Sequence, residues 1–110
     1  MSERLKKIND LIRDETSRVI LAEMEFGRGV IVTVTRAETS PTLEHSTVSI
    51  SIFPEKESEK TLVQINKKIY AIQQSLNKRL IMRPVPKIRF KIDQSGQYAE
   101  KIEKIINNVI

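Results

Sequence analysis

The chain has no cysteine and no tryptophan, and it has only one histidine and three glycines. Without cysteine, disulfide bonds, thiolate metal sites and cysteine nucleophiles are excluded, and we expect neither a metal nor another cofactor. No apolar run approaches the roughly 18 residues that a membrane-spanning helix needs. The first residues, Met1–Lys7, lack the apolar stretch of a signal peptide, so we expect a cytoplasmic protein.

What the chain does have is a strongly uneven distribution of charge. Its 110 residues are 39 % apolar and 30 % charged, which is typical of one globular domain, residues 1–110, and the net charge is +5. Between Glu59 and Asp93 there is no acidic residue at all. The basic residues in this tract are Lys60, Lys67, Lys68, Lys78, Arg79, Arg83, Lys87, Arg89 and Lys91. Surfaces that only need to be soluble mix both signs, so the tract predicts an anionic partner; the alternative is a solvated helix with a chance bias.

The first half of the chain predicts one helix and two strands. Apolar residues at spacings of three, four and seven indicate an amphipathic helix over Ser2–Glu25, and Gly27 and Gly29 are expected to end it and to form the turn into the next element. Val30–Glu38 and Thr47–Phe53 alternate between apolar and polar residues, which is typical of strands with one buried face. The turn-rich segment between the two strands predicts an antiparallel hairpin.

The segment Glu59–Leu80 carries the clearest helical pattern and is expected to form one helix. Leucine and isoleucine recur along one face, and at 100° per residue Lys60, Lys67 and Lys78 fall on the opposite face. A basic face of this length can follow several backbone phosphates. Lys78 and Arg79 also suit the negative end of the helix dipole, so a purely structural role is equally open for these two.

The last part of the chain predicts a third strand and a final helix. Pro84 and Pro86 favour an extended lead-in to a strand over Lys87–Ile92, and a helix with an apolar stripe from Tyr98 to Ile110 follows. The order helix, strand, strand, helix, strand, helix predicts an α+β fold, with a three-stranded mixed sheet and the helices packed on one face. The other face would be open and polar, offering Thr33, Thr35, Ser49, Ser51, Lys87, Arg89 and Lys91.

The sequence offers few candidates for catalysis. His45 beside Glu44 could transfer a proton, but no activated nucleophile or second metal ligand accompanies the pair, so we interpret His45 as a surface histidine. The carboxylates of the first helix lie among arginines, which favours a solvated ion-pair face over paired catalytic carboxylates. Tyr70 lies off the apolar stripe, and we expect it to cover a neighbouring helix rather than stack on a base.

Two stretches of the chain resemble bacterial ribosome-binding factor A. The stretch Met82–Ser95, MRPVPKIRFKIDQS, resembles the family pattern L-R-x-x-P-x-L-x-F-x-x-D-x-S. Upstream, Val34–Pro41, then Leu43, then Val48–Ser51 are similar to the family's hairpin. The resemblance covers essentially the whole chain and marks it as a divergent member.

The resemblance implies a single type II KH-like domain with the order αββαβα. It implies a monomeric, non-enzymatic factor that binds the free 30S subunit and 16S rRNA in late maturation, supports rRNA processing and cold adaptation, and shares a pathway with maturation GTPases. The family usually carries Ala-x-Gly at a kink in the long helix. The corresponding positions here are Lys68-Ile69-Tyr70, and without a glycine we expect a straighter helix.

Our hypothesis is an RNA-binding assembly factor for the small ribosomal subunit. All nine cations of the acid-free tract are the candidate RNA-binding residues: five on the long helix, one after it and three on the third strand. Two alternatives come from other functional classes. One is a general KH-like module for single-stranded RNA or DNA outside ribosome biogenesis. The other is a protein-interaction module whose cations meet an acidic partner.

Overall fold

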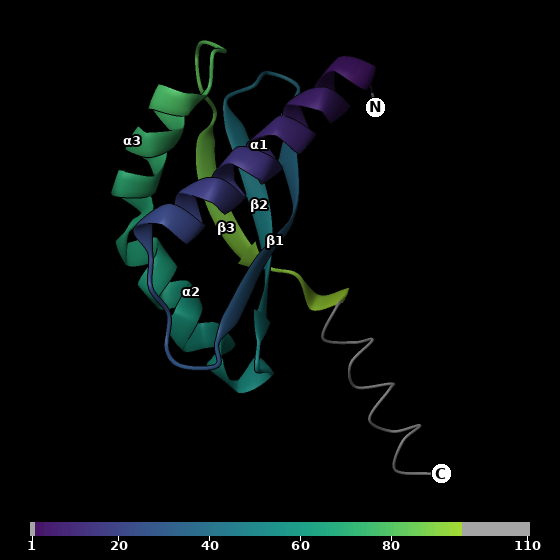
Figure 1. Cartoon of the computed structure of the whole chain (residues 1–110). Helices are drawn as coiled ribbons and strands as arrows, with labels where there is room; N and C mark the ends of the chain where they lie inside the picture. The colour runs from purple at the N-terminus through teal and green to yellow at the C-terminus, as the bar shows by residue number, and fades with distance from the viewer. Residues whose placement is uncertain (1, 96–110) are drawn as a thin grey trace.

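The computed structural model describes residues 2–95, so the predicted final helix from Tyr98 to Ile110 lies outside the described residues. The described elements follow the expected order, except that the long helix is divided in two (Figure 1). They are α1 (Glu3–Glu23), β1 (Ile31–Thr39), β2 (His45–Phe53), the short 3-10 helix η1 (Glu55–Glu57), α2 (Ser58–Lys67), α3 (Ile69–Arg79) and β3 (Lys87–Ile92).

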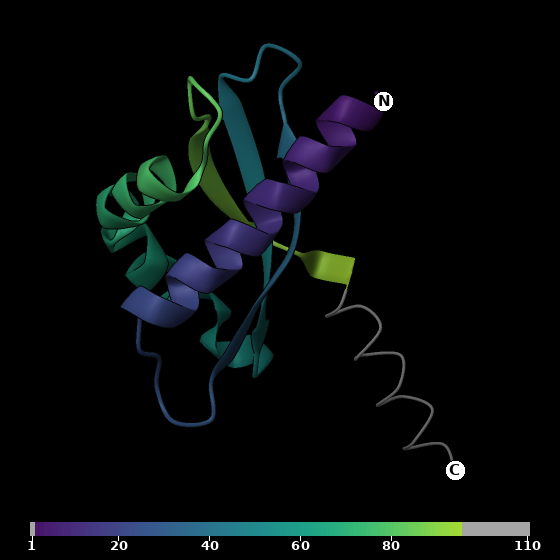
Figure 2. The same ribbon diagram turned by 45° about the horizontal axis from the view of Figure 1, so that its top comes forward.

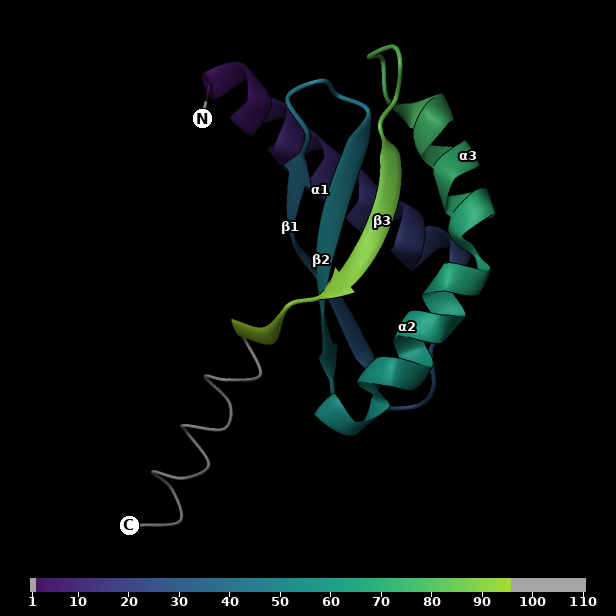
Figure 3. The ribbon, with the colours of Figure 1, turned by 180° about the vertical axis from the view of Figure 1, so that it is seen from behind.

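The sheet is mixed and has the strand order β1-β2-β3, as expected. β2 pairs with β1 antiparallel and with β3 parallel. A parallel pair needs a crossover connection, and α2 and α3 supply it. The helices lie on one face of the sheet, where α1 crosses it diagonally (Figure 2). Seen from behind, no labelled helix passes in front of the strands, so α1, α2 and α3 leave the opposite face uncovered (Figure 3).

Helix α1 begins with a side-chain cap but ends without a glycine. The Oγ atom of Ser2 accepts a hydrogen bond from the backbone N–H of Leu5 at 3.1 Å, which satisfies one of the free donors of the first turn. The helix ends at Glu23, and Met24 is extended. The expectation that Gly27 and Gly29 end this helix is therefore wrong. The expected turn before β1 is present, and Gly29 lies in it with a positive φ of 78°.

Strand β1 contains a bulge that the simple alternation did not predict. The register with β2 shifts between Val34 and Arg36, so Thr35 is an extra residue in β1. Before the bulge Val34 faces the helices, and after it Ala37 does. Without the bulge, the alternation would have turned Arg36 toward the core.

Ser49 also differs from its expected exposure. It lies on the open side of β2, but it is only 1 % exposed. The chain leaving β3 lies close by, because the N–H of Asp93 donates to the carbonyl of Ile50 at 2.7 Å. The hydroxyl of Thr35 contacts both the carbonyl of Ser49, at 3.2 Å, and the carboxylate of Asp93, at 2.6 Å. The end of the third strand therefore covers part of the sheet face that we expected to be free.

The expected single helix over Glu59–Leu80 is broken at Lys68. This residue has φ −102° and ψ 9°, outside the helical range. Its N–H donates to the carbonyl of Ile65 at 2.9 Å, a three-residue bond, and its carbonyl begins α3 by accepting from Ile72. The expectation of a straighter helix is wrong because this conformation needs no glycine. The apolar stripe continues across the break, so its periodicity gave no sign of it.

Helix α3 is joined to β3 by the side chain of Gln73. Its amide oxygen accepts from the N–H of Ile88 at 2.9 Å, and its amide nitrogen donates to the carbonyl of Pro86 at 3.1 Å. Because β3 is an edge strand, its outer N–H groups have no neighbouring strand. Gln73 satisfies one of them and fixes where β3 begins relative to α3.

The core lies between the helices and the sheet. Its fully buried side chains include Ile12 of α1, Ile50 of β2, and Ile72 and Leu76 of α3. Helices α1 and α3 also contact each other directly, and this contact forms one boundary of the core.

We expect Leu76→Ala to lower the free energy of unfolding by about 3 kcal/mol, because it removes a fully buried side chain and leaves a cavity. Urea denaturation measures this change. Val63→Ala, on the exposed side of α2, is the matched control and should change the stability by less than about 0.5 kcal/mol. Equal effects of the two substitutions would contradict the described packing.

Candidate nucleic-acid interface

All nine cations of the acid-free tract are exposed, but they occupy three different environments. Four form a row along α2, the break and α3, which we call the helical row: Lys60, Lys67, Lys68 and Lys78. Arg79 and Arg83 lie at the end of α3 and just after it. Lys87, Arg89 and Lys91 lie on β3 and are called the strand cations.

The helical row faces away from the core. Helix α2 buries Ser58, Thr61 and Ile65, and at 100° per residue Lys60 and Lys67 fall on its opposite side. Tyr70 lies beside the break and is 75 % exposed. Our expectation that its ring covers a neighbouring helix is therefore wrong. The ring is accessible next to the helical row.

Arg79 and Arg83 make contacts within the protein. The guanidinium of Arg79 lies 3.4 Å from the carboxylate of Glu15 on α1. Arg83 donates to the carbonyls of Leu80 at 2.6 Å, Met82 at 2.7 Å and Asn77 at 3.2 Å. A cation here suits the negative end of α3 and satisfies carbonyls that the helix leaves unpaired. These two arginines therefore stabilise the end of α3, whatever else they bind.

The strand cations point to the open face of the sheet, as expected. Their neighbours Ile88 and Phe90 are buried toward the helices, so the alternate side chains face the other way. The parallel register places Lys87 beside His45, Arg89 beside Thr47 and Lys91 beside Ser49.

Two basic side chains on this face were missed by the reasoning from sequence. The antiparallel register pairs Arg36 with Ser49, so the bulge in β1 brings Arg36 to the open face. His45 belongs to the same face through its pairing with Lys87. No local pattern joins Arg36 to residues some fifty positions later in the chain. Only the register of the sheet brings them together.

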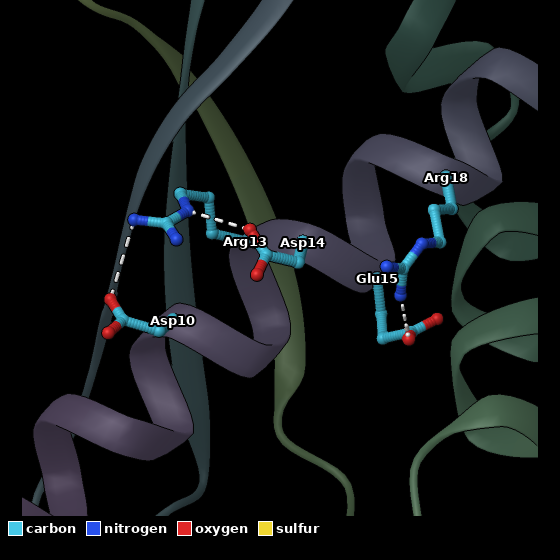
Figure 4. Close-up of polar contacts among 5 residues, drawn as sticks. All are labelled: Asp10, Arg13, Asp14, Glu15 and Arg18. Carbon is cyan, nitrogen blue, oxygen red and sulfur yellow. Dashed lines mark hydrogen bonds and ion pairs between the residues drawn. The ribbon is translucent and has the colours of Figure 1, made fainter.

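Three carboxylates of α1, those of Asp10, Asp14 and Glu15, form ion pairs with arginines, as expected (Figure 4). Arg13 lies 2.9 Å from Asp14 and 3.4 Å from Asp10. Arg18 lies 2.6 Å from Glu15. The hydrogen bond with Asp14 and the charge of that carboxylate raise the pKa of Arg13. This part of α1 is a mixed, solvated charge surface.

His45 and Glu44 are both exposed at the start of β2. Within residues 2–95, no three or more histidine, aspartate or glutamate side chains gather closely enough to hold a metal ion. None of the helices in that range has the length and apolar character needed to cross a membrane.

Asp93 is the carboxylate whose environment is most unusual. It is 6 % exposed and accepts hydrogen bonds from the backbone N–H of Ser95 at 3.0 Å and from its hydroxyl at 2.6 Å, besides the bond from Thr35. The side chains of Ser95 and Thr35 stabilise the charged form and lower the pKa of Asp93 to about 2.

The sequence matches a family model described as ribosome-binding factor A over residues 4–106. A protein of that name from Thermomicrobium roseum is 30 % identical over 109 residues, which is 98 % of this chain and 84 % of that protein. The corresponding protein from Brevibacillus brevis is 32 % identical over 107 residues, covering 96 % of this chain and 88 % of the relative.

Solved structures with the same description share the fold. The crystal structure of ribosome-binding factor A from Thermus thermophilus has a TM-score of 0.72 at 20 % identity, covering 83 % of this chain and 97 % of that one. A Thermus thermophilus homology model of the factor, fitted into a cryo-EM map of a 30S complex, has a TM-score of 0.67 at 21 % identity. That comparison covers 78 % of this chain and 91 % of the other.

We expect Asp93→Asn to destabilise the protein most at neutral pH. The pKa of Asp93 lies below its ordinary value of 3.8 in the folded state, so the charged form contributes stability above about pH 4, and this is lost as the pH falls toward 2. The free energy of unfolding, measured with urea, should be about 2 kcal/mol lower than that of the wild type at pH 7 and lower by about half of that at pH 3. Glu44→Gln, which removes an exposed carboxylate, is the control. A difference that grows on acidification would contradict the assignment.

Arg83→Gln should lower the free energy of unfolding by about 1 kcal/mol, because three carbonyls lose a charged donor. Thermal unfolding measures the loss. Lys87→Gln removes the same charge from an exposed strand position and should leave the melting temperature nearly unchanged. An equal response of the two variants would show that the contacts of Arg83 contribute nothing to stability.

Proposed function

Because the chain belongs to the ribosome-binding factor A family, we propose that it is a non-enzymatic assembly factor that binds the free 30S ribosomal subunit and its 16S rRNA during late maturation. The observation that carries the proposal is the family match over residues 4–106. A Thermus thermophilus relative with the same fold is described in a complex with the 30S subunit. The protein would then act in the cytoplasm as a monomer, in the same pathway as maturation GTPases.

The charges of the described surface support RNA as the ligand. The helical row is exposed, faces away from the core and lies in a tract without acidic residues. Cations that neutralise phosphates release condensed counterions, so such a surface gains affinity without reading base sequence. The exposed ring of Tyr70 beside the row adds a face on which an unpaired base can stack.

We expect a tagged copy to sediment with free small subunits, and not with assembled ribosomes, on sucrose gradients of cell lysate. The association should weaken between low and moderate salt, because phosphate contacts are screened. Protein found only at the top of the gradient at both salt concentrations, while the purified protein still binds bare RNA, would favour a general RNA-binding module. Binding to an acidic protein but not to rRNA would favour the protein-interaction class.

Lys60→Gln/Lys67→Gln should weaken binding to purified small subunits and reduce the slope of log affinity against log salt by about one to two units. Lys6→Gln/Lys7→Gln is the matched control, since it removes two exposed lysines from α1, outside the acid-free tract. Filter binding at several salt concentrations measures both variants. A slope that changes equally in the two variants would mean that net charge, and not the helical row, determines the affinity.

A further inference from the structure

The open face of the sheet carries its own group of basic side chains. The register of both strand pairs brings them together from three strands. We call this group the sheet-face cluster: Arg36, His45, Lys87, Arg89 and Lys91. Each of these residues is exposed.

Few acidic groups oppose the sheet-face cluster. Glu38 lies 3.7 Å from Arg36, and both of these side chains are more than half exposed. The carboxylate of Asp93 is already held by Thr35 and Ser95. No described acidic side chain pairs with a strand cation within ion-pair distance. The strand cations are therefore available to an external anion.

A shallow hollow of about 520 Å³ lies beside part of the sheet-face cluster. Three members of the cluster, His45, Lys87 and Arg89, line it together with the hydroxyl-bearing Thr47 and the acidic Glu38. Alternate residues of a strand are roughly 6.7 Å apart, so the strand cations extend this basic surface along β3. Cationic and hydroxyl groups around one concave surface can together contact phosphate and sugar oxygens.

The sheet-face cluster and the helical row lie on different sides of the molecule. The helices cover one face of the sheet, and the helical row is on the side of α2 and α3 that faces away from the core. The sheet-face cluster lies on the face that no labelled helix covers (Figure 3). A single short strand of RNA that follows one of these surfaces leaves the other free.

We propose that the sheet-face cluster binds RNA phosphates separately from the helical row, so that one molecule holds two RNA segments at the same time. This inference rests on the proposed function, in which the ligand is rRNA. A protein with two such surfaces would hold two parts of a folding RNA close together.

The composition of the face favours RNA over an acidic protein. A stable protein interface has an apolar, well-packed centre. Here the side chains between the cations are Thr47 and Ser49, and the exposed apolar pair Ile31 and Phe53 lies farther along, where β2 ends. Charge without an apolar centre suits a phosphate backbone, which is recognised mainly through its charge.

The test is the stoichiometry with a single-stranded RNA of about ten nucleotides, within the length that one binding surface covers. In analytical ultracentrifugation at low salt, the wild-type protein should bind two oligomers. Lys87→Gln/Arg89→Gln/Lys91→Gln should bind one, and Lys60→Gln/Lys67→Gln should also bind one. Arg4→Gln/Lys6→Gln/Lys7→Gln, which removes three cations of α1, is the matched control and should still bind two. Thermal unfolding checks that each variant is folded.

A wild-type stoichiometry of one, unchanged in the strand variant, would overturn the inference. If the protein still sediments with small subunits in that case, the proposed function stands and only the second binding surface is lost. If the association with small subunits is also absent, the proposed function fails as well. Displacement of RNA from this face by an acidic peptide of equal charge would identify an acidic protein as the better ligand and would also overturn the inference.

Discussion

The pairing of the central strand β2 with both of its neighbours is the constraint on which the rest of the structure depends. Because β2 and β3 run parallel, the chain between them must cross over, and α2 and α3 form that crossover on the same face as α1. Within residues 2–95, no helix covers the other face of the sheet (Figure 3). The same register decides which side chains stand next to each other on that face, including Lys87 beside His45.

The crossover meets this constraint with two helices instead of one. The break at Lys68 divides the crossover into two shorter helices. Ile65 before the break and Ile72 after it are both fully buried. Packing of the apolar stripe on both sides therefore stabilises a conformation at Lys68 that the local sequence does not require.

The cations of the acid-free tract fall into two groups. Arg79 and Arg83 join the end of α3 to α1 and to backbone carbonyls, which strengthens the fold. The helical row and the strand cations are exposed. They are the ones proposed to contact RNA phosphates. Arg83 suits contacts within the protein because its planar guanidinium group can donate to several carbonyls at once.

Local patterns in the sequence were enough to identify the first helix, the three strands, most buried faces and the unequal charge, because periodicity and composition act over a few residues. The family was recognised from short motifs such as the stretch around Phe90. Three features depended on the folded chain: the break at Lys68, the bulge that turns Arg36 outward, and the contacts that hold Arg83. Each arises from packing or hydrogen bonds between residues that local patterns do not connect. Strand register and helix ends are decided by such contacts, so only the tertiary structure shows which charges meet on one surface.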